Sequence, residues 1–242
     1  MLETDGPWDA IVDRVRPGAP LPELGVPDLA LWAALGAGVL VVAVPALWRL
    51  LRVAVTVVHE LGHAVVGVLV GRSFTGLVLR ADMSGHAVTV GRSRGAGRVA
   101  TTWAGYPAPA LVGAGLVLAA AAGWAAPVLL VVTVLLLGGL LRARSVYTVA
   151  VLVVTVGGAG WLWWAGAARV QGLVLLAVGL VLLLGAWRHL GAALRSRDPG
   201  SDPAVLARIT RVPRVVWVAT FVLVLAGASG LAVERILLLL GR

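Results

Sequence analysis

The chain has 242 residues, of which 60% are apolar and 13% charged, and its mean hydropathy is +0.98. Soluble globular domains have roughly 45–50% apolar and about 25% charged residues, so this composition excludes that class and predicts a protein embedded in the lipid bilayer. The absence of Cys excludes thiolate metal sites, and the net charge of +9 does not indicate a nucleic-acid partner, because the Arg residues lie mainly between apolar runs, where they fit topology signals and lipid headgroups.

The predicted elements follow from apolar runs near the length of about 20 residues that crosses a bilayer. Residues 1–28 are polar and Pro-rich and predict an N-terminal tail with one short amphipathic turn around Ile11 and Val12. Apolar helices are predicted over residues 29–44, 46–71, 99–122, 124–141, 146–165, 169–190 and 213–234. The predicted fold class is therefore an all-α polytopic membrane protein of about seven transmembrane helices, with a single bundle over residues 29–240.

Two connecting segments differ from the rest. Residues 72–98 contain two short β-leaning runs, 74–80 and 85–90, separated by the turn 81–84, and predict a small β-hairpin. Residues 191–212 are polar and predict a loop with a short helix. With a cytoplasmic amino terminus, the segments 72–98, 142–145 and 188–214 face the cytoplasm and hold most of the Arg residues outside the tail, as the positive-inside rule requires. This orientation places the chemistry near the cytoplasmic face.

A metal-binding motif lies inside the second apolar run. His59-Glu60-Leu61-Gly62-His63 matches H-E-x-x-H, in which two imidazoles one helical turn apart share a face and can hold one Zn²⁺. Glu60 can then take the proton of a water molecule that the metal activates. A charged side chain at the centre of a membrane helix costs on the order of 2.5–3.5 kcal/mol, so these residues are expected to have a partner, and a metal ion is the natural one.

The motif and its surroundings resemble the site-2-protease clan of intramembrane zinc metallopeptidases and, more narrowly, the bacterial peptidase M50B-like family. The segments that support the resemblance are 59–64, 84–89, 104–110 and 200–210. The resemblance implies that His59, His63 and a later Asp bind zinc, and that Glu60 is the catalytic base. The clan's usual Asn-Pro-Asp-Gly or Leu-Asp-Gly sequence is absent here, and Asp202 is the candidate to take its place.

Several alternatives remain open at the level of sequence. Asp202 precedes a Pro and could instead be the N-cap of a short helix at 203–211. His86, Asp82 and Asp198 are rival ligands, of which the first two also fit a solvated turn. His189 is expected at a helix end facing lipid headgroups, where a cation suits the helix dipole.

The sequence therefore predicts a zinc-dependent endopeptidase of a bacterial cell membrane that cleaves a membrane-anchored protein near the cytoplasmic face. Its expected partners are that substrate and the bilayer, and no oligomeric state is predicted. An inactive zinc-binding regulatory protein and a small transporter are the alternatives. Glu60 favours the enzyme, because a purely structural or transport site has no use for a base beside the His pair. A transporter should also show repeated halves with broken helices, which the sequence does not indicate.

Overall fold

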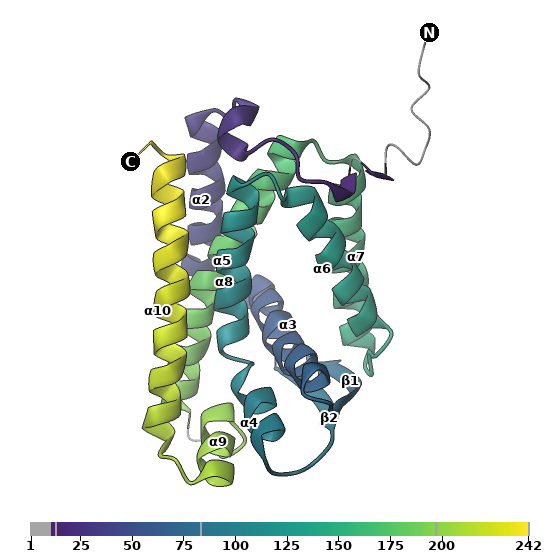
Figure 1. Cartoon of the computed structure of the whole chain (residues 1–242), viewed down its shortest axis with the longest axis vertical. Coiled ribbons are helices and arrows are strands. Elements are labelled where there is room, and N and C mark those ends of the chain that lie inside the picture. Colours follow the sequence, from purple (N-terminus) through teal and green to yellow (C-terminus); the bar gives the residue numbers. More distant parts are fainter. Residues whose placement is uncertain (1–10, 13, 83, 197, 242) are drawn as a thin grey trace.

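The computed structural model describes residues 11–12, 14–82, 84–196 and 198–241 (Figure 1). Its elements are the 3-10 helix η1 (Leu21–Leu24), helices α2 (Asp28–Ala43) and α3 (Pro45–Leu69), strands β1 (Ser73–Leu79) and β2 (Gly85–Val90), and helices α4 (Ala96–Trp103), α5 (Pro107–Ala121), α6 (Ala125–Leu140), α7 (Val146–Ala165), α8 (Ala168–Arg195), α9 (Asp202–Thr210) and α10 (Arg214–Leu239). The predicted helical bundle, with a hairpin directly after the H-E-x-x-H helix, is confirmed. Residues 1–10 of the predicted tail lie outside the described part of the chain.

Within the described residues, fewer helices than predicted are long enough to cross a membrane. Helices α3, α7, α8 and α10 meet the length and hydropathy of a span, and α4 with α5 makes a fifth if this bent pair counts as one. Helices α2 and α6 have 16 residues each, which is about 24 Å and short of a hydrocarbon core of about 30 Å. Seven spans are therefore not confirmed.

The helix predicted over residues 99–122 is broken. Helix α4 ends at Trp103, α5 begins at Pro107, and the two axes differ by 59°. Pro107 has no backbone N–H to continue the preceding helix and instead takes the first position of α5. The single-helix prediction is wrong here, and the short bend 104–106 that replaces it lies beside the H-E-x-x-H motif.

Helices α2 and α3 run in the same sense along α8 and do not form two antiparallel spans. A Cβ on Gly38 in α2 would lie 3.0 Å from the carbonyl oxygen of Ala177. Farther along, the ring of His59 in α3 lies 4.9 Å from that of His189. From α2 to α3 the chain thus continues in one direction, toward the carboxyl end of α8.

This direction places the start of the described chain opposite the hairpin. Figure 1 shows η1 and the end of α10 at one end of the molecule, and the hairpin, α4 and α9 at the other. The prediction that the tail shares a side with the hairpin is wrong for residues 14–28. Part of that segment also packs against the bundle: Leu21 is 1% exposed, and the Gly18 N–H donates to the Gly123 carbonyl at 2.8 Å.

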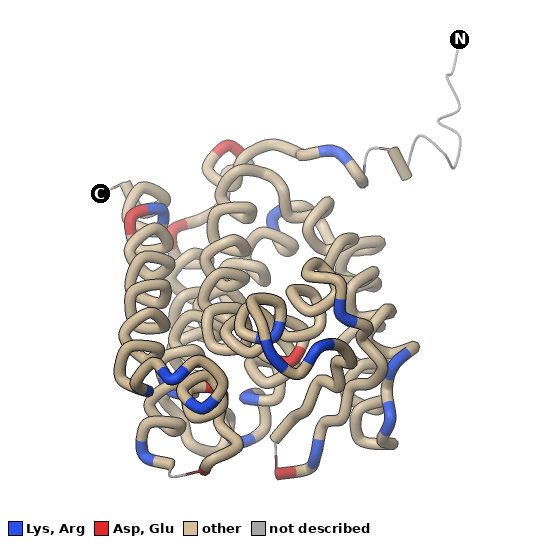
Figure 2. Tube along the Cα trace, turned by 60° about the horizontal axis from the view of Figure 1, so that its bottom comes forward, with Lys and Arg blue, Asp and Glu red and all other residues tan. Residues whose placement is uncertain are grey.

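The hairpin is fixed on both sides. Strands β1 and β2 are antiparallel, with Leu77 opposite Ala87. The Leu77 N–H donates to the Arg142 carbonyl at 2.9 Å, and the Arg144 N–H donates to the Leu77 carbonyl at 3.0 Å, so the α6–α7 turn covers the outer edge of β1. Strand β2 packs against α3 on the other side. The Arg residues gather toward this end of the molecule (Figure 2).

Single-Cys labelling tests this topology, because the native chain has no Cys. Cys at Ser93 and at Ser196 should be labelled from one side of the membrane, and Cys at Gly18 and at Gly241 from the other. By the positive-inside rule the Ser93 side should be cytoplasmic. Labelling of Gly18→Cys from the same side as Ser93→Cys would mean that α2 and α3 cross the membrane separately, as the sequence predicted.

Candidate metal centre

The two His residues of the motif lie on one face of α3, one helical turn apart. Their Nε2 atoms are 3.2 Å apart, and the rings meet edge to face with centroids 4.8 Å apart. Nδ1 of His63 lies 2.7 Å from the Thr101 carbonyl on α4. A carbonyl can only accept, so this nitrogen carries the proton, and His63 turns the lone pair of Nε2 toward His59.

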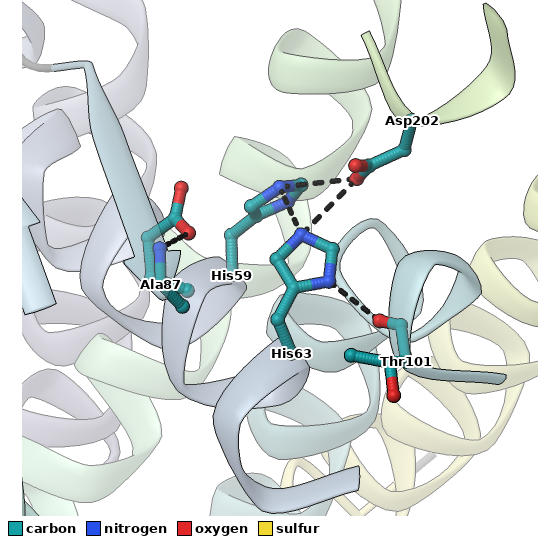
Figure 3. Close-up of polar contacts among 6 residues, drawn as sticks. His59, His63, Ala87, Thr101 and Asp202 are labelled. Carbon is teal, nitrogen blue, oxygen red and sulfur yellow. Dashed lines mark hydrogen bonds and ion pairs between the residues drawn. The ribbon is translucent and has the colours of Figure 1, made fainter. Parts of the chain in front are cut away.

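Asp202 joins this pair from the far end of the chain (Figure 3). Its Oδ2 lies 3.3 Å from Nε2 of both His59 and His63. Asp202 is the first residue of α9, whereas Ser201 holds the N-cap position, and no side chain caps the helix. The Asp202 carboxylate is therefore directed at the His pair and does not cap α9.

The three donor atoms fit a tetrahedral zinc ion. Zinc ligands at about 2.0–2.1 Å in a tetrahedron are about 3.3–3.4 Å apart, close to the 3.2 and 3.3 Å separations among these atoms. Asp202 Oδ2 is buried and has no hydrogen bond. Lone pairs that converge without a proton between them repel, and a cation removes that repulsion. Within the described residues, this triad is the group of His, Asp and Glu side chains arranged to hold a metal.

Glu60 is held beside the triad by the hairpin. Its Oε2 accepts a hydrogen bond from the Ala87 N–H of β2 at 2.7 Å, and the side chain is buried. Gly85 lets β2 approach this closely, since a Cβ there would lie 2.8 Å from Cγ of Glu60. The β2 backbone thus orients the carboxylate that the motif supplies.

A second glycine contact brings the bend between α4 and α5 onto the His pair. A Cβ on Gly105 would lie 2.5 Å from Nε2 of His63 and 2.6 Å from Cε1 of His59. On α3 itself, a Cβ on Gly62 would lie 2.5 Å from Cβ of Ala108. The motif helix and the bend therefore pack together at a distance that only glycine allows.

Gly105→Ala should consequently disturb the metal centre. We expect a loss of bound zinc, because the added methyl group would occupy the space in which the two imidazoles face each other. Gly115→Ala is the matched control on α5, where a Cβ meets no atom within 4 Å. The measurement is the zinc content of both purified variants, and equal zinc content in Gly105→Ala and Gly115→Ala would contradict this packing.

The triad and Glu60 line one cavity of about 430 Å³. The rival ligands are placed differently from the triad. His86 lines the cavity on β2 but lies outside the triad, and Asp82 is exposed and accepts hydrogen bonds from Ser84. Asp198 lines the cavity and accepts from the Gly200 N–H at 2.8 Å.

Two cavity residues were not singled out by sequence as parts of the site. His189 does not face headgroups as expected, because α8 continues past it to Arg195 and its ring lines the cavity. Tyr106 lies in the bend and contacts His59 edge to face at 4.9 Å. The available signals were weak: a single His in an apolar helix, and the small-residue segment 104–110.

A bundle of apolar helices that encloses two His, one Asp and a neighbouring Glu defines a membrane protein with a candidate metal centre. The model of the peptidase M50B-like family matches residues 32–232, and the chain belongs to this family. No curated protein and no solved structure matches the chain. Membership supports a membrane peptidase, and zinc metallopeptidase chemistry is a property of the family.

Proposed function

We propose that this protein is a zinc-dependent intramembrane endopeptidase that cleaves a membrane-anchored protein near the Arg-rich, cytoplasmic face. The observation that supports this most is the triad of His59, His63 and Asp202, with separations of 3.2 and 3.3 Å, in the same cavity as Glu60. A metal-binding protein without catalysis would need the triad but not the base.

The triad of His59, His63 and Asp202 would hold the metal. A zinc ion bound there supplies Lewis acidity, which activates a water molecule and polarises the peptide carbonyl. Glu60 would accept a proton from the attacking water as the water oxygen bonds to the carbonyl carbon, and would later donate that proton to the leaving amine. The Ala87 N–H keeps the carboxylate oriented throughout.

The substrate has to reach this base in an extended form, because a helical peptide bond is already hydrogen-bonded and shielded. The outer edge of β1 is covered by the α6–α7 turn. The backbone N–H and C=O of Leu77 point toward the α6–α7 turn, so in this antiparallel pair those of the opposite residue Ala87 point to the other side of the hairpin. The Ala87 N–H donates to Glu60 there, which leaves the Ala87 C=O for a substrate segment. We therefore assign the β2 edge, which borders the cavity, as the edge on which an unwound substrate segment pairs.

A reconstituted cleavage assay tests the proposed function. Purified protein and a single-span reporter are placed in the same vesicles, and the products are mapped by mass spectrometry. We expect one cut close to the Arg-rich side. A wild-type protein that retains zinc but cuts none of a panel of single-span reporters would contradict an endopeptidase and favour a zinc-binding regulatory protein.

Asp202→Asn separates the ligand role of Asp202 from a helix-capping role. Asn caps a helix nearly as well as Asp, so a cap would survive the change. A lost ligand should lower zinc affinity by more than the about 10–100-fold that removal of an outer-shell partner costs. Asp198→Asn is the matched control from the same loop and should retain zinc. Normal zinc affinity in Asp202→Asn would remove Asp202 from the proposed site.

A further inference from the structure

His189 is a cavity residue to which the mechanism above gives no role. It projects from α8, and its ring centroid lies 4.9 Å from that of His59 and 5.4 Å from that of Tyr106. Tyr106 in turn stacks at 5.2 Å on Phe221, which is fully buried. The His189 ring is thus held between a candidate zinc ligand and an aromatic wall that cannot move freely.

Two structural roles do not account for this placement. His189 is not part of the group arranged to hold a metal in the described chain. It does not orient His59 either, because Nδ1 of His59 is buried without a hydrogen bond. No hydrogen bond engages the His189 imidazole within the described residues, and the ring lines the cavity in which the substrate would react. Its N–H is therefore available to a bound molecule.

We propose that His189 is a further catalytic residue, whose N–H donates a hydrogen bond to the carbonyl oxygen of the scissile peptide bond. The inference rests on the proposed function. As the water oxygen bonds to the carbonyl carbon, Glu60 takes the proton and the C=O electron pair moves onto the oxygen. When the C–N bond breaks, that pair returns, and the amine leaves with the proton from Glu60.

The charge on this oxygen exists only between those two steps, so a donor fixed beforehand stabilises the transition state more than the bound substrate. His189 is partly buried, and a hydrogen bond made away from bulk solvent is stronger than one made in water. The packing of His189 against His59 and Tyr106 fixes the ring before the substrate arrives, as this form of stabilisation requires.

The test compares two substitutions of His189 that differ in whether a hydrogen-bond donor remains. His189→Phe keeps an aromatic ring and removes the donor, whereas His189→Asn keeps an N–H donor. We expect His189→Phe to lower kcat by about 10²–10³-fold with little change in KM, and His189→Asn to recover much of that loss. Both should retain wild-type zinc content. Leu194→Ala, at a half-exposed position of the same helix, controls for folding.

Loss of zinc in His189→Phe would overturn the proposal, because His189 would then support the metal. An unchanged kcat, or a change in KM alone, would overturn it as well. A second measurement does not depend on cleavage: the affinity for a peptide phosphonate, whose tetrahedral oxyanion mimics the reacting carbonyl. This affinity should fall in His189→Phe by a factor similar to that for kcat.

The phosphonate also separates this inference from the proposed function. If the wild-type protein holds zinc but cuts no reporter, the proposed function fails, and phosphonate affinity alone decides the role of His189. An affinity that is equal in wild type and His189→Phe would overturn the role. A selective loss in His189→Phe would support His189 as an oxyanion-binding residue of a site that does not turn over.

Discussion

Glu60→Gln is expected to lower kcat by about 10²–10⁴-fold, the usual contribution of a positioned general base, while zinc content and folding stay unchanged. Gln has almost the same size as Glu, and its amide oxygen can still accept the Ala87 N–H that holds Oε2 at 2.7 Å. What it cannot do is take a proton from water. Zinc analysis measures the zinc content, thermal unfolding tests the folding, and reporter cleavage gives kcat.

Glu234→Gln is the matched control, since Glu234 is exposed on α10 and does not line the cavity. It should behave as the wild-type protein. Wild-type cleavage by Glu60→Gln would remove Glu60 from the mechanism. Loss of zinc in this variant would instead make Glu60 a support of the metal centre.

The second large effect concerns the metal itself. His59→Ala and His63→Ala should each lose most of the bound zinc, because either change leaves two of the three facing donor atoms. His86→Ala is the control: this His lines the same cavity but lies outside the triad. The variants should be compared by zinc analysis without chelators. Equal zinc content in His59→Ala and His86→Ala would contradict the site.

Local sequence patterns predicted the elements on which the candidate site is built. Spacing alone places His59 and His63 on one face of a helix, and the motif helix stops as expected, since Gly71 has a φ of +79°. The β-leaning runs after it form the predicted hairpin. These features depend on neighbours within a few residues, which the sequence displays directly.

The long-range contacts could not be predicted in the same way. Asp202 is followed by Pro203, a pattern that fits a helix start as well as a ligand, and only the packing of α9 near α3 brings its carboxylate within 3.3 Å of both His residues. The approach of Gly105 likewise depends on the bend at Pro107. His189 was expected at a helix end facing lipid headgroups, but α8 continues past it, and tertiary packing turns its ring toward His59.

The predictions of the number and of the direction of the spans were wrong for a related reason. Hydropathy shows that residues 29–44 and 46–71 are both apolar, but it does not show whether the chain reverses at Pro45. The contacts of α2 and α3 with α8 show that it does not. A direction of travel is a property of packing between helices, and apolar surfaces of similar composition do not specify it.

The measurement that tests the central claim most directly is the zinc content of the wild-type protein, followed together with reporter cleavage through chelation and re-addition of zinc. We predict close to one zinc per chain after purification without chelators, loss of cleavage as the zinc is removed, and recovery when it is restored. A wild-type protein that binds no zinc, or that cleaves equally well without it, would contradict a zinc peptidase built on His59, His63 and Asp202.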